Sequence, residues 1–441
     1  MKKVDLTEGK VISVISKLAI PIMGSSLLQF TYNIVDMFWV GGLGSDAVAS
    51  VGSSSFFTGF GYSINALVVM GTGIKVSHSL GKDEEGEVRE YINSGIIINL
   101  VLGLLYAIIL LLFGKYFIGF LNLGNEVVEK GANLYLNLGA PMLFFSFFNL
   151  MYIRIFGSYG QNSKALKISA IGIVLNIILD PIFIYIFDFK VLGAAIATLI
   201  SNIAMFVVFR LISKGLFKFD FNVGIDKNKV IEIIKLGLPI SFQGMLFTLV
   251  NIMLARIISV FGSDAIAGQK IGLQIEAISF MIIGGLNGAI ASFTGQNFGA
   301  KKYDRIIKGY HTSLYIGIIY AVITSLLFLL IPNYLVKIFI KDISTIEIAT
   351  MYLKIIAYSQ IFSAVEMVSH GMFTGLGMPK IPATISILFT VLRIPMALIF
   401  TKYFGVNGVW ISISLSSVFK GVASYVMYII KVRKDKNRIY S

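Results

Sequence analysis

The stretch Leu18–Val40 reads LAIPIMGSSLLQFTYNIVDMFWV and decides how the rest of the chain is interpreted. It is apolar along most of its length and long enough to cross a bilayer, which takes about 20 residues of helix. Asp36 lies inside this stretch. A carboxylate in a spanning helix costs roughly 2.5–3.5 kcal/mol on insertion scales, so such residues tend to face a cavity or a partner and to have a function.

A second carboxylate is embedded in the same way. Asp180 ends the motif NIILD, which begins at Asn176 and is followed by Pro181, inside another apolar run. Asn176 and Asp180 are four residues apart and therefore share a helix face, as do Tyr32 and Asp36. We predict that the two aspartates form one buried cation site in a membrane transporter.

Neutral oxygen atoms near the two carboxylates fit the same prediction. A dehydrated cation needs carboxylates for charge and amide or hydroxyl oxygens to replace lost water. Asn176 and Thr198, on the next apolar run, offer such oxygens, and Pro181 cannot donate to the carbonyl of Ile177. We predict that Asp36, Asn176, Asp180 and Thr198 bind the coupling ion, which would be Na⁺ or H⁺. For Asn176 and Thr198, a polar contact that only joins helices is the alternative.

The composition is that of a membrane protein. Hydrophobic residues make up 56% of the 441 residues and charged residues only 14%, against about 25% charged in soluble domains. The absence of cysteine excludes disulfides and thiolate metal sites, and three scattered histidines argue against a histidine-built metal centre. We therefore expect no resident cofactor. We read the apolar run near the N-terminus as an uncleaved first span rather than a signal peptide.

Apolar runs of spanning length recur along the whole chain. They predict an all-α membrane protein with twelve transmembrane helices, near residues 12–40, 46–78, 93–113, 132–156, 163–187, 191–213, 233–260, 266–296, 306–331, 349–376, 380–403 and 406–431.

Lysine and arginine placement predicts the orientation. The net charge of +14 is spread over many short loops, and most of the 37 basic residues fall on the side that holds both chain ends. By the positive-inside rule both termini are cytoplasmic in the cell membrane. This distribution explains the charge as a topology signal and argues against nucleic acid as a partner. In this interpretation Lys420 belongs to the cytoplasmic side, whereas Lys270 and Arg393 fall within spans.

The chain contains an internal duplication. Lys17-Leu18-Ala19-Ile20-Pro21 returns as Lys235-Leu236-Gly237-Leu238-Pro239, and Gly44-Ser45-Asp46-Ala47 returns as Gly262-Ser263-Asp264-Ala265. Two six-helix halves with the same orientation are related by a pseudo-two-fold axis along the membrane normal. We predict an N-terminal lobe at 1–213, a cytoplasmic linker at 214–232 and a C-terminal lobe at 233–441. A short interfacial helix is expected at 226–235.

Several further residues are expected to have functional roles. Pro21 should weaken or kink the first span, unless it marks a helix entrance. Glu276 and Glu366 lie in spans of the second half and either act there or are neutralised by Lys270 or Arg393. The expected substrate-cavity residues are polar side chains within spans: Gln29, Tyr32, Asn33, Asn149 and Glu276.

Five motifs resemble the multidrug and toxic compound extrusion (MATE) family, and the likeness runs through the whole chain. They are YNIVDMFWVGGLGSDAVASVG from Tyr32, SLGK from Ser79, NIILDPIFIY from Asn176, LGAAIATLIS from Leu192 and GQNFGA from Gly295. The aspartate in the first span is similar to that of the DinF-type branch. The resemblance implies a V-shaped pair of lobes and efflux of cationic or amphiphilic small molecules, coupled to inward Na⁺ or H⁺. It also implies an ion site at Asp36, Asn176, Asp180 and Thr198, and bending at Pro21.

Two other functions compete with this one. A lipid-linked oligosaccharide flippase of the same superfamily would favour a cationic cavity, whereas this chain has aspartates in its first half and few cations within spans. An intramembrane aspartyl protease resembles a Tyr-Asp plus Gly-x-Gly-Asp pattern, but Ile178 and Leu179 precede Asp180 here. We therefore predict a monomeric antiporter in the lipid bilayer and not an enzyme.

Overall fold

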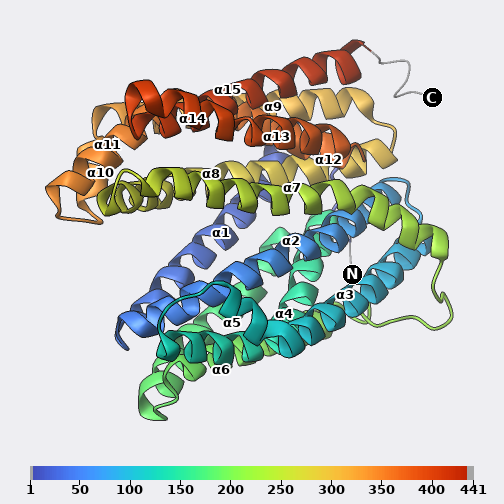
Figure 1. Ribbon diagram of the computed structural model, residues 1–441. Helices are drawn as coiled ribbons and strands as arrows, with labels where there is room; N and C mark the ends of the chain where they lie inside the picture. The colour runs from blue at the N-terminus through green and yellow to red at the C-terminus, as the bar shows by residue number, and fades with distance from the viewer. Residues whose placement is uncertain (1–2, 435–441) are drawn as a thin grey trace. The chain divides into compact units, whose positions relative to one another are not determined.

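The computed structural model describes residues 3–434, and every regular element in that range is a helix (Figure 1). The first half contains α1 (Val11–Gly41), α2 (Ser45–Gly81), α3 (Glu85–Phe120), α4 (Glu126–Ser158), α5 (Asn162–Pro181), the π-helical turn η1 (Ile182–Ile186) and α6 (Lys190–Ile212). The second half contains α7 (Lys227–Ser259), α8 (Ser263–Gly299), α9 (Tyr303–Leu330), α10 (Pro332–Lys337), α11 (Ile343–Ala357), α12 (Gln360–Gly375), α13 (Lys380–Val391), α14 (Arg393–Phe404), α15 (Asn407–Tyr428) and the π-helical η2 (Ile429–Lys434).

Among the described residues, 11 helices are long and apolar enough to cross a membrane, counting Lys380–Phe404 as one span. The number rises to 12 if the pair α11 and α12, bent by 58° at a short break, is also one span. The prediction of an all-α membrane protein is confirmed. The span expected near 349–376 corresponds to this broken pair. At the break the hydroxyl of Ser359 bonds to the carbonyl of Ile356, an alternative to the helical ladder.

Two compact units make up the chain: unit 1 comprises Met1–Asp5 and Gly24–Ser241, and unit 2 comprises Leu6–Met23 and Phe242–Ser441. Helices α1 and α7 therefore each contribute one part to either unit. The lobe boundaries expected from the sequence, 1–213 and 233–441, stay a prediction. The short interfacial helix expected at 226–235 is wrong, because α7 runs without interruption from Lys227 to Ser259.

The repeated motif has the same backbone geometry in both copies. Gly44 precedes α2 with φ 101° and ψ 174°, and Gly262 precedes α8 with φ 96° and ψ 175°. This region of φ and ψ is accessible almost only to glycine, which explains why glycine occupies both positions.

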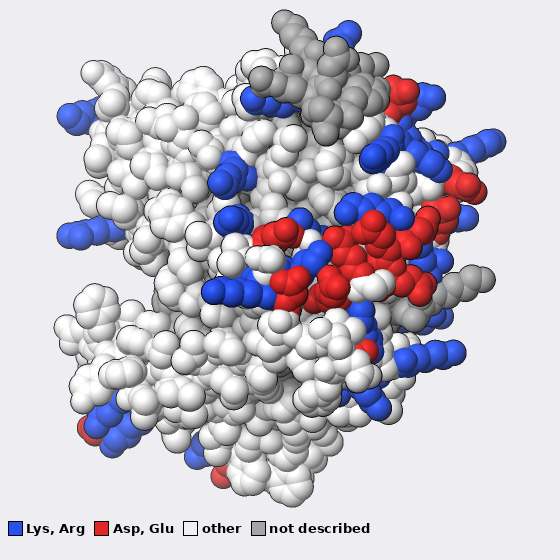
Figure 2. All heavy atoms as spheres, turned by 90° about the vertical axis from the view of Figure 1, so that its right-hand side faces the viewer, with Lys and Arg blue, Asp and Glu red and all other residues white. Residues whose placement is uncertain are grey.

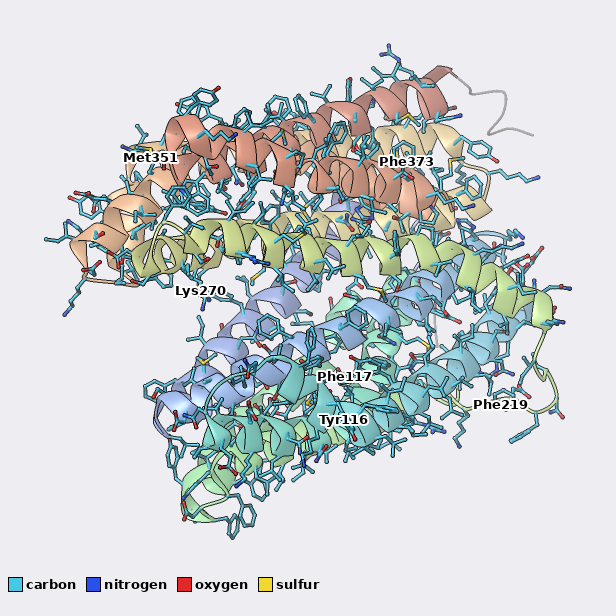
Figure 3. The ribbon with its side chains drawn as sticks, in the orientation of Figure 1. Tyr116, Phe117, Phe219, Lys270, Met351 and Phe373 are labelled. Atoms are coloured by element: carbon cyan, nitrogen blue, oxygen red, sulfur yellow. The ribbon has the colours of Figure 1, made fainter. Side chains whose placement is uncertain are left out.

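The outer face of α3 in unit 1 is apolar and exposed. Leu105, Leu112 and Tyr116 are 52%, 65% and 75% exposed, and Figure 3 labels Tyr116 on this helix. In unit 2, by contrast, Phe373 of α12 is fully buried in a core that also holds Tyr310 and Tyr428. An exposed apolar face of this kind is expected where a helix meets lipid.

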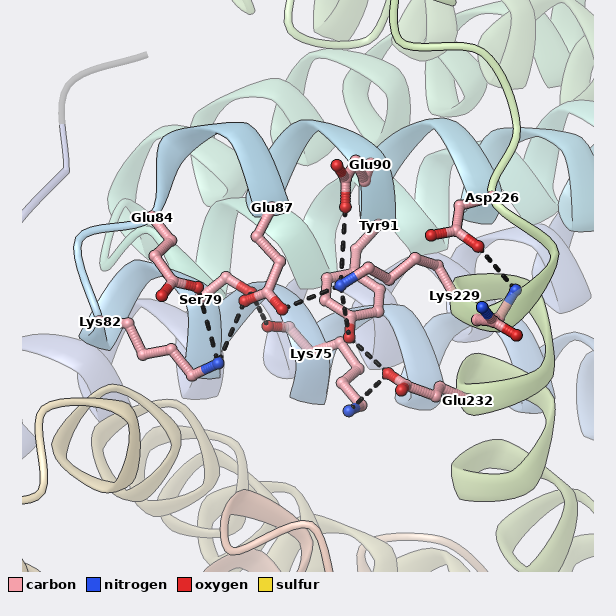
Figure 4. Close-up of polar contacts among 11 residues, drawn as sticks. Lys75, Ser79, Lys82, Glu84, Glu87, Glu90, Tyr91, Asp226, Lys229 and Glu232 are labelled. Atoms are coloured by element: carbon pink, nitrogen blue, oxygen red, sulfur yellow. Dashed lines mark hydrogen bonds and ion pairs between the residues drawn. The ribbon is translucent and has the colours of Figure 1, made fainter.

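The first part of α7 is fastened to α2 and α3 within unit 1. A Cβ atom added at Gly237 would collide with the carbonyl oxygen of Leu67, so only glycine allows the two helices to approach so closely. Next to this contact, Lys75 pairs with Glu232 at 2.7 Å and Lys229 pairs with Glu87 at 2.9 Å (Figure 4). Figure 2 shows acidic and basic side chains gathered side by side on this face.

The linker after α6 is held against α3. Arg89 donates to the carbonyl of Leu216 at 2.9 Å, and the amide nitrogen of Asn93 donates to the carbonyl of Asp220 at 2.8 Å. These bonds hold the linker in place against α3, whereas the sequence analysis predicted only that it connects the two halves.

Residues 6–9, which precede α1, are bonded to α8 and α9. Leu6 is 1% exposed, and its backbone bonds to Gln296 and Asn297 at the end of α8, at 3.1 Å each. Arg305 of α9 donates to the carbonyls of Glu8 and Gly9 at 2.5 and 2.8 Å. This segment of unit 2 is therefore tied down by backbone hydrogen bonds.

Candidate cation site

Asp180 lies where α5 changes into a π-helical turn. Its side chain is fully buried, Pro181 follows it, and η1 begins at Ile182. Proline has no N–H to donate to the carbonyl of Ile177, and the chain accommodates this loss by widening into the π-helix. The sequence NIILDP thus places a carboxylate at an irregular point of a spanning helix, and such π-turns are frequent at functional sites.

Asp36 faces the same region of unit 1 from α1. The two carboxylates are close enough for the charge of Asp36 to act electrostatically on Asp180. The Oδ1 atoms of both side chains are buried and accept no hydrogen bond from the described residues. Two buried carboxylate oxygens without donors are costly unless a proton or a cation binds them.

Asn176 of α5 and Thr198 of α6 are polar neighbours of this pair. When the nitrogen of the Asn176 amide faces Asp180, it donates to Oδ2 at 3.0 Å. The amide oxygen then accepts from the backbone nitrogen of Thr198 at 3.1 Å, so the amide links α5 to α6. The Thr198 hydroxyl lies 2.9 Å from the carbonyl of Ala194 and 3.4 Å from the hydroxyl of Tyr32. The structure therefore brings together Tyr32, Asp36, Asn176, Asp180 and Thr198.

Tyr135 of α4 belongs to the same cluster, and sequence reasoning missed it. Its side chain is 8% exposed, and both Asp36 and Asp180 act on its hydroxyl electrostatically. A tyrosine near the start of an apolar run carries no signal in the sequence, because many such residues lie at membrane interfaces. Only the packing of α4 against α6 and α2 places this one at the carboxylates.

The residues expected to line the substrate cavity differ in exposure and do not form one group. Gln29 and Asn33 are exposed on α1, where the Gln29 amide donates to Asn33 at 3.3 Å. Asn149 is buried and donates to the carbonyl and the side chain of Asn202 at 3.0 and 3.2 Å, which joins α4 to α6. Its contacts favour the helix-joining role common for asparagine in membranes.

Glu276 belongs to unit 2, whereas the aspartate pair belongs to unit 1. It is 6% exposed, and its Oε2 accepts from the hydroxyl of Tyr352 at 2.5 Å. Of the two cations considered for it, Lys270 is exposed on α8 (Figure 3), whereas Arg393 is near enough to act electrostatically. Lys420 also acts on it.

The cytoplasmic assignment of Lys420 is wrong. The residue lies inside α15, is 6% exposed, and pairs with Glu366 of α12 at 3.2 Å. The positive-inside rule assigns lysines to the aqueous side, because burying a lone ammonium group in a membrane is costly. Here the carboxylate of Glu366 on another helix offsets that cost. Both Glu366 and Lys420 are thus neutralised within unit 2.

The donor set of unit 1 suits a hard monovalent cation or a proton. Residues 3–434 contain no group of three or more His, Asp or Glu that could hold a metal ion, so a transition-metal centre is not indicated in that range. Two carboxylates with the hydroxyl of Thr198 nearby fit an oxygen-lined site for a hard cation such as Na⁺. The same carboxylates can accept a proton instead.

Comparison with known proteins identifies the family. The family described as MatE matches residues 21–182 and 239–399, most of the chain. The chain belongs to the MatE family. This confirms the MATE resemblance, and because the family consists of transporters, it agrees with the expectation that the chain is not an enzyme. The two matched segments follow the internal duplication of this MatE protein.

Relatives of this MatE protein include two curated bacterial proteins. It is 26% identical over 428 residues to the probable multidrug resistance protein NorM of Thermotoga maritima, covering 94% of this chain and 91% of that protein. It is 26% identical over 430 residues to the multidrug export protein MepA of Staphylococcus aureus, covering 94% and 93%.

Solved structures show the same fold. A crystal structure of a MATE protein superposes with a TM-score of 0.92 at 23% identity, covering 99% of this chain and 100% of that one. A MOP superfamily transporter from Pyrococcus furiosus gives a TM-score of 0.90 at 24% identity, covering 99% of both chains. At this identity the likeness supports the MATE fold alone.

Proposed function

We propose that this protein is a cation-coupled antiporter that exports organic cations and other drug-like amphiphiles by alternating access. The observation that carries the proposal is the pair of buried carboxylate oxygens on Asp36 and Asp180, inside spanning helices and without donors. Such groups need an exchangeable cation to be stable in a membrane. The names of the relatives NorM and MepA, which refer to multidrug resistance and export, support drug-like substrates.

The coupling ion is Na⁺ or H⁺, bound by Asp36, Asn176, Asp180 and Thr198. The two carboxylates favour either ion, since like charges held close together bind a proton or a cation more readily than separated ones. The hydroxyl oxygen of Thr198 favours Na⁺, because a proton needs no such ligand, and Asn176 contributes through the amide nitrogen that bonds to Asp180. Tyr135 and Tyr32 border the ion-binding residues in unit 1.

Further assignments complete the proposal. Asp36 in the first span supports the DinF-type branch, and the basic loops support cytoplasmic termini in the cell membrane. We propose a monomer. The substrate-facing residues are Gln29, Tyr32 and Asn33 on α1, with Asn149 supporting the same unit and Glu276 acting separately in unit 2.

A competition between ion and drug tests this function. Ligands shift conformations only through differential affinity, and the coupling between two ligands is reciprocal. Purified protein should therefore bind a cationic dye more weakly as Na⁺ or proton concentration rises, and the dye should weaken ion binding by the same factor. Dye affinity that does not change across a pH and Na⁺ series would contradict the proposal.

Thr198→Ala distinguishes the two ions in the same assay. The variant loses a neutral oxygen but keeps both carboxylates. If Na⁺ is the coupling ion, a higher Na⁺ concentration is needed to displace the dye, while the pH dependence stays as in the parent. If protons couple transport, both dependences stay unchanged.

Pro21→Ala tests the proposed bending of α1. Pro21 lies ten residues inside this helix, so the alternative that it marks a helix entrance is wrong. It cannot donate to the carbonyl of Lys17, and two residues later the contacts of α1 pass from unit 2 to unit 1. Alanine restores the bond and stiffens the helix, so we expect slower dye efflux from proteoliposomes at unchanged expression. Unchanged efflux would exclude bending at Pro21 as a step of transport.

A further inference from the structure

Arg393 is a buried cation at the start of α14, far from both ends of the span Lys380–Phe404. It is 6% exposed. A guanidinium at this depth costs several kcal/mol unless polar groups or a counter-charge compensate it. Its immediate partners therefore decide what it can do.

Two neutral hydroxyls of α15, which packs beside α14 (Figure 1), hold the guanidinium. Nε donates to the Oγ of Ser416 at 2.6 Å, and Nη2 donates to the Oγ of Ser417 at 3.4 Å. Both hydroxyls give their own protons to the carbonyl of Ile413, at 2.9 and 3.1 Å. The two oxygens can thus only accept from Arg393, which fixes one edge of the guanidinium without neutralising its charge.

The other edge of the guanidinium remains open. Arginine has five N–H donors, and the edge formed by Nη1 and Nη2 is the one that meets a carboxylate with two parallel bonds. Arg393 makes no further hydrogen bond and no ion pair with the residues that the structure describes. The ring of Phe247 lies 6.0 Å from the guanidinium carbon and is 44% exposed, so this charge lies close beneath an accessible surface of unit 2.

The carboxylates of unit 2 are already engaged. Glu276 accepts from Tyr352, and Glu366 pairs with Lys420. Both act on Arg393 electrostatically, but neither lies within ion-pair distance of it. With two acidic and two basic side chains the cluster is formally neutral. A lone anion would leave this neutral cluster with an unbalanced negative charge, whereas a zwitterion brings its own compensation.

We propose that Arg393 is a carboxylate-binding subsite that sets the preference among amphiphilic substrates, because the carboxylate of a zwitterionic amphiphile contacts Nη1 and Nη2. This inference rests on the proposed export function, because it names a specificity-determining residue of the same transporter. Arg393 would bind the carboxylate, Ser416 and Ser417 would orient it, and Phe247 would cover the substrate's apolar part.

A matched pair of dyes tests the subsite. Rhodamine B carries a carboxylate and a delocalised cation, and its ethyl ester carries the cation alone. Binding of each dye to the purified full-length protein is measured by fluorescence anisotropy. A charge-assisted bond contributes roughly 1.5–3 kcal/mol, so Arg393→Gln should raise the Kd ratio of rhodamine B to its ester about tenfold or more. Arg393→Lys should give an intermediate Kd ratio, because lysine keeps the positive charge but lacks the two parallel N–H donors of a guanidinium.

Two further variants complete the design. Arg256→Gln removes an exposed arginine of α7 and should leave the ratio unchanged. The double variant Ser416→Ala with Ser417→Ala keeps the charge but loosens its orientation, and it should raise the ratio even if Arg393→Gln does not fold. If the Kd values of both dyes rise by the same factor in the Arg393 and serine variants, or if neither Kd changes, the proposed subsite is wrong.

Efflux measured beside binding separates the two proposals. If the parent protein binds the dyes with the predicted discrimination but exports neither from proteoliposomes, the export function fails and the subsite stands. If the parent exports both dyes and the variants do not change the Kd ratio, export stands and the carboxylate subsite fails.

Discussion

Asp180→Asn is expected to abolish dye efflux while leaving the protein in the membrane at the parent's level. The amide is nearly isosteric with the carboxylate, and it keeps an oxygen near Asn176. It carries no charge, however, and can neither exchange a proton nor balance Na⁺ inside a spanning helix. Asp36→Asn should have the same effect, because the two carboxylates act as one site. Dye efflux from intact cells, with immunodetection of the membrane fraction, measures both variants.

Asp46→Asn is the matched control for these substitutions. Asp46 lies in the first turn of α2, is exposed, and accepts from the amide of Asn125 at 3.2 Å. Its replacement should leave efflux at the parent's rate. Full dye resistance in either Asp36→Asn or Asp180→Asn would show that this aspartate does not couple transport and would direct attention to Glu276.

Lys420→Met is expected to destabilise unit 2 strongly. The ammonium of Lys420 lies 3.2 Å from Glu366, and both side chains are mostly buried. Removing one partner of a buried ion pair costs about 3–5 kcal/mol, because the other charge stays behind without a close counter-charge. Arg393 acts on Glu366 only from beyond ion-pair distance and cannot replace the lysine. The midpoint of thermal unfolding in detergent should therefore fall.

The double variant Lys420→Met with Glu366→Gln should recover most of the lost stability, since it removes both charges together. Lys82→Met serves as a control, because Lys82 is 44% exposed and its ion pairs with Glu84 and Glu87, at 3.6 and 3.3 Å, lie at the surface. Such surface pairs contribute about 0–1 kcal/mol. If Lys420→Met unfolds at the same temperature as Lys82→Met, the buried pair does not stabilise unit 2.

The membrane fold and the pairing of two aspartates could be predicted from the amino-acid sequence. Apolar runs of bilayer length predict spans because every backbone polar group in lipid must bond within its own helix. The repeat around Gly44 and Gly262 is visible for an equally local reason, the positive φ that both glycines adopt. Asp36 and Asp180 stand out because charge is so rare in spanning segments that each one requires an explanation.

Contacts between polar side chains on different helices could not be predicted in the same way, because they depend on how the helices pack. Tyr135 joins the carboxylates because of how α4 packs, whereas Asn149 turns to Asn202, and no spacing along the chain distinguishes the two cases. Hydropathy also did not predict the break between α11 and α12, because both helices are apolar enough to be counted together as one span. The charge of Lys420 led to the prediction that it faces the cytoplasm. In the structure it is buried, because Glu366 on another helix pairs with it. Hydropathy records the cost of burying one residue, whereas the partner that offsets this cost is set by helix packing alone.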